Sequence, residues 1–473
     1  MHRTMKKLIL YITSFGLLTA FTACKKYLDV NENPNIAVNP PINGLLASTT
    51  YNTGYTVYRT GDFTSYFSQY LASPSAGSGT DTYDEVDYTS TWTGVYNTMS
   101  DLYDLAHAAD SVGAYQHAGA ARVMMALNLS IINGIWGAVP YSEALNGNFI
   151  QPHYDTDKGV YDTCLSLVSQ GIASLERTDG KILLDATKDL LHHGSADAWK
   201  KSAYALKARL LNRISKKTDY SPANVLAALG QAYTGSTDDM QLTQFQSRSP
   251  WNQAAFNNDN NSLDAWLSTH FVAATNDSTF GVFDPRLPLI ASLTKFGDYR
   301  GTINGAGRIG SGTDAEESYL SSSTGFYSKG GAPLLIITYA ECKFIQSEAS
   351  FRAGDRATAY AAYLDGIRAH MDKLGVSTAN RDAYVNNPVV SVGAANLTLA
   401  LIMKEKYVAM FLNPEAWTDI RRMDYQYTDF KMPQNAVLPT FIRRVAYPTS
   451  EVTKNSGNVP AVGALSDKLW WDQ

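Results

Sequence analysis

Cysteine is scarce in this chain of 473 residues, which has only Cys24, Cys164 and Cys342. Three thiols cannot form a disulfide framework, and no C-x-x-C motif is present to bind zinc or carry out redox chemistry. Cys164 and Cys342 both lie in apolar helical patterns, so we expect two separately buried thiols. A single disulfide between them is the alternative in an oxidising compartment.

Basic charge is also scarce, because 39 Lys and Arg face 44 Asp and Glu. No run of Lys or Arg follows the first residues, so the chain lacks the electrostatic footprint of a nucleic-acid-binding protein. Long apolar runs are missing as well: beyond the N-terminus no segment approaches 18 apolar residues. The sequence therefore predicts neither a nucleic-acid partner nor an internal membrane span.

Motifs for catalysis and metal binding are absent or lie in the wrong context. The sequence has no P-loop, H-E-x-x-H or G-x-S-x-G. Residues 305–310 match G-x-G-x-x-G, but no strand pattern precedes them, so a flexible surface loop is expected. His192 and His193 cannot chelate one metal together from a helix, and we expect them at its solvated end. The chain is thus predicted to be neither an enzyme nor a holder of a metal or cofactor.

Adjacent carboxylates are the remaining signal for an enzyme, since glycoside hydrolases place two of them on either side of the scissile bond. The candidates are Asp84-Glu85, Asp238-Asp239 and Glu316-Glu317. All three pairs lie in polar surroundings, where solvated loops are the simpler interpretation. A glycoside hydrolase is therefore the least favoured hypothesis.

The N-terminus has the features of an export signal. Lys6 and Lys7 precede an apolar run of about 14 residues, which is too short for the roughly 20 that span a bilayer. Cys24 stands where cleavage would occur, so residues 1–23 are interpreted as a lipoprotein signal and Cys24 as the lipidated residue. The alternative is an ordinary cleaved signal with an incidental cysteine. Residues 24–44, rich in Asn and Pro, are then a lipidated tether.

The rest of the chain, residues 45–473, is predicted to be mainly α-helical. A helical body is expected over approximately 95–234 and 334–424, and a loop-rich lobe with short strands over approximately 235–333. Ala359-x-x-x-Tyr363 matches the second helix of a tetratricopeptide repeat. Helices are expected at 92–109, 118–135, 157–175, 195–215, 225–233, 334–352, 356–373, 396–412 and 414–424, with two more in 42–73 broken near Gly61.

Loop aromatics are the best candidates for a binding site, because sugar rings stack on aromatic faces while polar side chains bind their hydroxyl groups. Each of these aromatics has the alternative role of packing its own loop. The predicted ligand-binding residues are Tyr83, Tyr88, Trp92, Trp251, Trp266 and Tyr299.

In its order of short segments the chain resembles the SusD/RagB family of outer-membrane nutrient-binding lipoproteins of Bacteroidota, in the SusD-like 2 branch. The segments that carry the resemblance are Tyr27–Asn35, Val139–Leu145, Leu206–Leu210, Asp284–Leu287, Thr338–Phe344, Glu405–Phe411, Pro414–Trp417, Arg421-Arg422, Arg443-Arg444, Tyr447-Pro448 and Trp470-Trp471.

The resemblance implies tetratricopeptide-like helix pairs that form a helical body, and a loop-rich lobe that carries the ligand site. It implies an outer-membrane, surface-exposed protein anchored through acyl chains such as palmitate, and a SusC-like TonB-dependent transporter as partner. The ligand is an oligosaccharide in most members and a peptide in some. The alternative from a different functional class is a helical-repeat scaffold that assembles a surface complex and binds no ligand. Arg421 and Arg422 are expected to pair with carboxylates.

Overall fold

The computed structural model describes residues 41–260, 264, 266–310 and 315–473. The predicted signal at 1–23, the lipidation site Cys24 and most of the tether lie outside the described residues. The first helix of the described residues, α2, begins at Ile42, so the last three residues of the predicted tether lie in its first turn.

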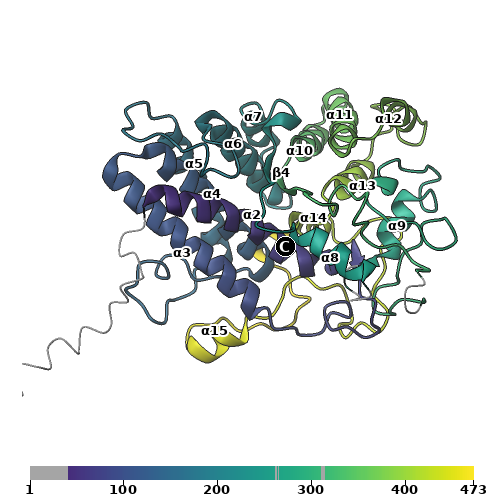
Figure 1. Cartoon of the computed structure of the whole chain (residues 1–473), viewed down its shortest axis with the longest axis horizontal. Helices are drawn as coiled ribbons and strands as arrows, with labels where there is room; N and C mark the ends of the chain where they lie inside the picture. The colour runs from purple at the N-terminus through teal and green to yellow at the C-terminus, as the bar shows by residue number, and fades with distance from the viewer. Residues whose placement is uncertain (1–40, 261–263, 265, 311–314) are drawn as a thin grey trace, which may run out of the picture. The chain divides into compact units, whose positions relative to one another are not determined.

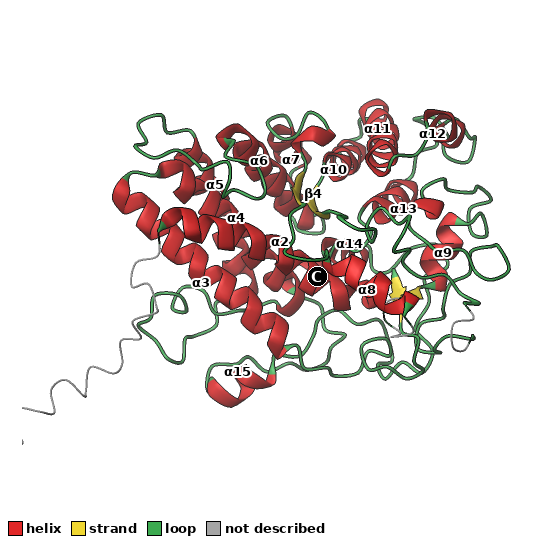
Figure 2. Cartoon of the chain, in the orientation of Figure 1, coloured by secondary structure: helices red, strands yellow, loops and turns green. Residues whose placement is uncertain are grey.

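Helices dominate the described residues, which contain fourteen α-helices and four short strands (Figure 2). The predicted fold class, mainly α, is therefore confirmed. The elements are α2 (Ile42–Phe67), β1 (Leu71–Ala72), α3 (Thr89–Val112), α4 (Tyr115–Trp136), α5 (Asp157–Leu175), α6 (Ala196–Arg213), α7 (Pro222–Leu229), β2 (Met240–Leu242), α8 (Pro250–Asp259), β3 (Trp266–Leu267), α9 (Thr269–Thr275), β4 (Leu334–Ile337), α10 (Tyr339–Arg352), α11 (Arg356–Leu374), α12 (Thr378–Val385), α13 (Leu399–Ala409), α14 (Glu415–Arg422) and α15 (Thr449–Lys454).

Sequential helices pack against one another as antiparallel pairs, most extensively α4 with α5 and α10 with α11 (Figure 1). Small residues allow the close approach: a Cβ at Gly119 of α4 would lie 2.9 Å from the carbonyl oxygen of Gly171 in α5. Ala359 and Tyr363 are both buried in α11, as the tetratricopeptide pattern predicts. Several helices start at a side-chain cap, among them those that follow Thr156, Ser195 and Thr338.

Helix α4 is the one helix among the described residues that is long and apolar enough to cross a membrane. However, 94% of its most apolar stretch is buried inside the protein, which identifies it as the central core helix.

Two sequence-based boundaries are wrong, for different reasons. Gly61 does not break α2, which runs unbroken from Ile42 to Phe67. A Cβ at position 61 would lie 2.4 Å from the carbonyl oxygen of Leu412, so glycine is required there for backbone contact rather than for a turn. Residues 334–337, predicted as helix, form strand β4, and α10 starts only after the Thr338 cap.

Two short antiparallel strand pairs join distant parts of the chain. β1 follows α2 and pairs with β3, with Leu71 opposite Leu267. β2 pairs with β4 directly before α10. Each pair joins segments that are far apart in sequence.

Buried ion pairs lock the helices together. Arg209 of α6 makes two hydrogen bonds of 2.6 Å to Glu341 of α10, with both side chains at most 4% exposed. Arg422 pairs with Glu348 and Asp419, as predicted. Arg421 does not: it donates to three backbone carbonyls and lies between the rings of Trp417 and Trp471.

The cysteine prediction is confirmed, because Cys164 and Cys342 are both free and buried. Burial raises the pKa of both thiols, that of Cys164 to about 12. Neither is therefore a reactive thiolate at neutral pH.

Candidate ligand-binding surface

One face of α2 carries a row of four half-buried tyrosines and one exposed aspartate. We call this row the tyrosine stripe and define it as Tyr51, Tyr55, Tyr58, Asp62 and Tyr66. Successive members are four, three, four and four residues apart, which places them on one side of an α-helix. The tyrosines are partly open to solvent and Asp62 is exposed. The opposite face of α2 is buried and contains many threonines, whose hydroxyl groups donate to carbonyls one turn earlier.

The rings of Tyr51, Tyr55 and Tyr58 form a ladder. Tyr51 stacks on Tyr55 with centroids 6.0 Å apart, and Tyr58 follows edge-to-face at 5.4 Å. Trp251 of α8 continues the ladder, 5.0 Å from Tyr58 at an interplanar angle of 82°. The guanidinium of Arg59 lies 4.7 Å from the Tyr55 ring centroid. These mutual contacts hold the rings in place, as a preorganised stacking surface requires.

A cavity of about 590 Å³ opens at the N-terminal end of the stripe. Its α2 side is formed by Ala47, Ser48, Tyr51 and Asn52. Facing them are Leu190 and the segment Gln244–Phe245–Gln246. The lining thus combines a tyrosine ring with three side-chain amides, each of which can both donate and accept hydrogen bonds.

The other end of the stripe is acidic. Asp62 is open to solvent on one side, but protein atoms surround it on the others, so its carboxylate is poorly hydrated. This desolvation, together with the charge of Asp264, raises the pKa of Asp62 to about 6. Desolvation and the same two carboxylates also raise the pKa values of Tyr58 and Tyr66, which keeps both phenols neutral. The surface therefore offers neutral phenols and one carboxylate that titrates near neutrality.

The structure separates the six residues predicted from loop patterns. Tyr83 and Trp92 are core residues, 1% and 3% exposed, packed near Phe67 and Trp136 respectively. Trp251 is 3% exposed and supports the stripe from behind through Tyr58.

The other three predicted residues lie at different places. Trp266 is 3% exposed beneath Tyr319 and the Arg308 guanidinium. Tyr88 is half-buried and stacks on Phe63 at 4.1 Å. Tyr299 lies half-buried in the lobe, 6.2 Å from Phe283. For the four buried rings, the observed role is packing, because they have no open face for a sugar.

The tyrosine stripe was not among the predicted sites. Its signal in the sequence is Y-x₃-Y-x₂-Y-x₃-D-x₃-Y, but the same spacing is produced by a helix face that points into a core. Only Asp62, placed among the tyrosines, indicates a solvent-facing row instead of a core-facing one, because an unpaired carboxylate is rarely buried.

The structure places the three carboxylate pairs in different surroundings. Asp84 and Glu85 are exposed neighbours, while Asp239 is buried and bound by Lys373 at 2.9 Å. Glu317 is buried and accepts hydrogen bonds from Thr302 and the Ile309 amide. Among the described residues, no three His, Cys, Asp or Glu side chains are grouped to hold a metal.

Two further expectations need correction. Gly305 and Gly307 of the G-x-G-x-x-G segment are tightly packed: a Cβ at Gly305 would lie 1.9 Å from the Gln434 carbonyl oxygen, and one at Gly307 2.6 Å from the Ala76 amide nitrogen. His192 is not solvated but buried, with Nε2 2.6 Å from the Ser202 hydroxyl and its ring against Trp199.

Comparison with known families identifies the chain. Residues 34–448 match the family model SusD-like_2, described as starch-binding and associating with the outer membrane. The chain belongs to this family. The resemblance inferred from the short sequence segments is thereby confirmed.

Solved SusD homologues share the fold. A chitin-binding SusD homologue from Flavobacterium johnsoniae superposes with a TM-score of 0.78 at 21% identity, covering 91% of this chain and 98% of that one. A SusD/RagB family protein from Bacteroides thetaiotaomicron gives 0.75 at 21% identity, with coverage of 91% and 98%. A SusD homologue from Bacteroides fragilis gives 0.75 at 19% identity, with coverage of 91% and 99%. No curated protein matches this SusD-like chain at a significant level.

Proposed function

We propose that this SusD-like protein binds a nutrient oligosaccharide on the tyrosine stripe and delivers it to a SusC-like TonB-dependent transporter in the outer membrane. The observation that supports the proposal is the stripe itself, an open row of rings beside amide groups and one carboxylate. The family description points to carbohydrate and to the outer membrane, and one structural relative is named as a chitin-binding protein.

The length of the stripe favours an extended ligand over a single sugar. From Tyr51 to Tyr66 the helix rises by about 22 Å, at 1.5 Å per residue. A surface of that length accommodates several sugar rings in a row. Open rings stack on the C–H faces, while Asn52, Gln244 and Gln246 at the cavity and Asp62 at the other end supply hydrogen bonds.

Anchoring and delivery complete the proposal. Cys24 would carry the acyl chains, such as palmitate, that hold the protein at the cell surface, because a doubly or triply acylated terminus binds membranes firmly. The role is non-catalytic binding without a cofactor. A peptide ligand on the same stripe is the second candidate, and a scaffold without a ligand the third.

Calorimetric titration of the full mature protein with maltohexaose and chitohexaose tests the binding role. Replacing Tyr55 or Tyr58 by alanine removes one stacking ring, worth about 1 kcal/mol or roughly a fivefold loss of affinity. Tyr103→Ala on α3 is the matched control, since that half-buried ring contacts only His107 among the described aromatic rings. Binding that is unchanged in both stripe variants, or absent for every member of a glycan array, would contradict the proposal.

A further inference from the structure

The side chains of the tyrosine stripe follow a straight line along α2. All five lie well inside this helix, which runs from Ile42 to Phe67. At about 100° per residue, their directions around the helix axis fall within roughly 80° of one another. A row that wound around the helix would instead spread over the full circle. The stripe therefore runs parallel to the helix axis over its whole length.

Neighbouring helices hold the middle of the row in place. Tyr58 packs edge-to-face on Trp251 of α8. The next residue, Arg59, lies against Gly94 of α3, where a Cβ would come within 2.2 Å of Arg59 Nη1. Only glycine leaves room for the guanidinium at that position. A row fixed in this way loses little entropy when a ligand binds along it.

Two charged side chains of the row have no ion partner. The guanidinium of Arg59 lies 4.7 Å from the Tyr55 ring centroid, and Asp62 follows three residues later. This spacing often allows an ion pair on a helix, but neither side chain makes a hydrogen bond or an ion pair with another described residue. A charged ligand would be attracted by one of them and repelled by the other. A hydroxyl group can accept from Arg59 or donate to Asp62, so the two charges favour a neutral ligand.

The row leads into the cavity of about 590 Å³, because Tyr51 belongs to both. None of the eight described residues that line this cavity is charged. Its amide side chains can donate to and accept from hydroxyl groups in the same way. The N-terminal end of the row is therefore also suited to a neutral, hydroxyl-rich ligand.

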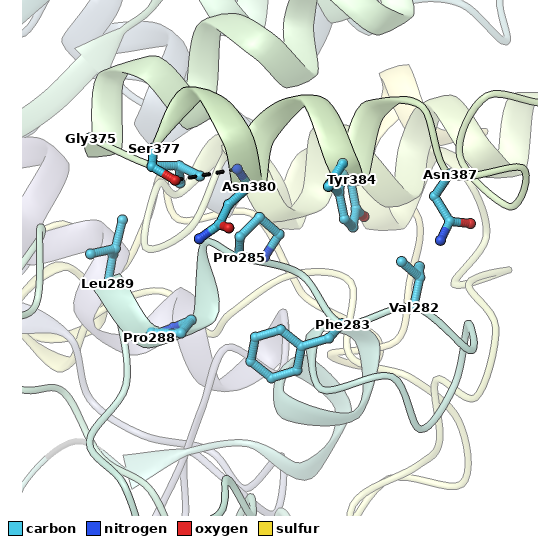
Figure 3. A pocket seen from close by; sticks show the side chains of 12 residues that line it. Val282, Phe283, Pro285, Pro288, Leu289, Gly375, Ser377, Asn380, Tyr384 and Asn387 are labelled. Carbon is cyan, nitrogen blue, oxygen red and sulfur yellow. Dashed lines mark hydrogen bonds between the residues drawn. The ribbon is translucent and has the colours of Figure 1, made fainter.

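A second cavity, of about 470 Å³, offers no such row (Figure 3). It lies between α12 and the loop segment 282–289, and none of its lining residues belongs to α2. The two aromatic rings in its lining are those of Phe283 and Tyr384, and Tyr384 is only 3% exposed. One open ring cannot hold a long glycan, so Phe283 provides a control for an exposed ring outside the stripe.

Resting on the proposed function, we infer that the ligand of the tyrosine stripe is a straight, neutral glycan with β-1,4 linkages. Successive sugars of a β-1,4-linked chain turn over at each bond, and the chain stays extended, as in cellulose. Such a chain can follow the stripe along its rise of about 22 Å. Its sugars would meet the rings in turn, while their hydroxyl groups bind Arg59 and Asp62.

An α-1,4-linked chain of the starch type fits the row less well. It bends in the same direction at each bond and forms a coil, so it leaves a straight row after a few sugars. A coil therefore contacts the rings at one end of the stripe and cannot reach those at the other. The linkage between the sugars, more than the sugars themselves, decides how many rings are used.

Calorimetric titration of the full mature protein with cellohexaose and maltohexaose tests the inference. The two probes contain the same six glucose units and differ only in the linkage. We expect cellohexaose to bind at least tenfold more tightly, since a straight chain keeps about two more ring contacts, each worth about fivefold in affinity. Affinity should also rise along the series from cellobiose to cellohexaose.

Variants at the two ends of the row test whether one chain spans it. Tyr51→Ala and Tyr66→Ala should each weaken cellohexaose binding about fivefold, and the double variant about twenty-five-fold, because the two rings are far apart. Maltohexaose should respond to at most one of them. Arg59→Gln should weaken cellohexaose binding roughly threefold to tenfold by removing a charged hydrogen-bond donor. Phe283→Ala is the matched control and should leave both affinities unchanged.

Two results would overturn the inference and leave the proposed function standing. One is maltohexaose that binds as tightly as cellohexaose and loses affinity in the stripe variants, which would mean a coiled ligand. The other is cellohexaose binding that changes in only one of the two end variants, which would mean that the chain does not follow the row. If neither hexaose and no glycan of an array binds to a protein that melts normally, the proposed function fails as well.

Discussion

Arg286 of the loop lobe donates a hydrogen bond to Glu405 of α13 in the protein interior, although the two residues are 119 positions apart. Arg286 is fully buried and also pairs with Asp284 and contacts Nδ1 of His370. Because these partners come from the lobe, α11 and α13, a single guanidinium holds the lobe against the C-terminal helices.

Removing the Glu405 charge should therefore destabilise the whole domain. Glu405→Gln leaves Arg286 with only Asp284 to balance its charge and weakens the bond from Lys404. Breaking a buried pair in this way costs about 3 kcal/mol. Thermal denaturation followed by circular dichroism measures the effect. Asp162→Asn removes the partner of Lys158 in an exposed pair and should cost less than about 0.5 kcal/mol. Similar melting temperatures for both variants would refute the assignment.

Stability should fall in acid, beginning near pH 6.5. Burial lowers the pKa of His192 and of His270 to about 4, so the folded protein keeps both rings neutral. The unfolded chain binds these protons near pH 6.5, and stability is therefore lost as the pH falls from about 6.5 to 4. Each histidine contributes up to about 3 kcal/mol of this loss.

Replacing His270 tests this window, because the ring packs between Tyr407 and Phe430 and accepts an apolar ring of similar size. We expect His270→Phe to melt with a shallower pH dependence between pH 6.5 and 4 than the parent protein. Below that range the buried carboxylates determine the pH dependence of stability. Desolvation raises the pKa of Glu405, but the charges of Lys404 and Arg286 outweigh it and lower the pKa to about 2. The stabilisation from Glu405 is therefore lost as the pH falls from about 4.5 to 2. An unchanged slope in His270→Phe would show that the ring does not titrate as proposed.

Substitution of Gly61 tests which of two interpretations is right, the helix breaker predicted from the sequence or the backbone contact seen in the structure. If Gly61 were a helix breaker, Gly61→Ala would stabilise the chain by up to about 1 kcal/mol. The contact of α2 with the Leu412 carbonyl predicts the opposite, a loss of about 1–3 kcal/mol through overpacking. Gly230→Ala is the control, since a Cβ there meets its nearest atom at 3.4 Å and the φ of −62° suits alanine. The two melting temperatures, measured together, decide between the interpretations.

If an oligosaccharide binds on the tyrosine stripe, its affinity should depend on pH through Asp62. The carboxylate accepts stronger hydrogen bonds from sugar hydroxyls when charged than when protonated, by about 1 kcal/mol. Since its pKa is raised to about 6, we expect affinity to fall about fivefold between pH 7 and pH 5. Asp62→Asn should bind weakly and equally at both values in calorimetric titration. A pH dependence that persists in Asp62→Asn would assign the titration to another group.

The longer helices were predictable because each has to present an apolar face at a period of 3.6 residues, and that period is visible in the sequence. The short helices α8, α9, α12 and α15 were not predicted. In the structure the hydroxyl groups of Ser195 and Thr338 accept from free backbone amides at helix starts, and the prediction of a helix from 334 overlooked Thr338. Strand β4 escaped prediction because its residues, Leu334–Ile337, are a short apolar run that periodicity cannot distinguish from helix.

For the candidate site, the sequence predicted the types of side chain but not which residues face solvent. Tyrosine and tryptophan beside polar residues indicated a surface for sugar, but a ring's exposure depends on which helix lies across it. Trp251 and Tyr58 illustrate this: the first ring is buried and the second is half-buried, although they touch. The residues that adjoin Trp251 and Tyr58 in the sequence are of similar types. The two rings differ in the residues that other elements pack against them.

The sequence by itself determined the family, the helical class and the three cysteines, because each of these depends on residue type and spacing along the chain. The tertiary structure alone decided which aromatic rings face solvent, why Gly61 is glycine, and why Arg422 pairs with carboxylates while its neighbour Arg421 binds carbonyls between two tryptophans. The physical reason is that burial, close backbone contact and ion pairing are properties of two segments brought together in space, and neither segment encodes them alone.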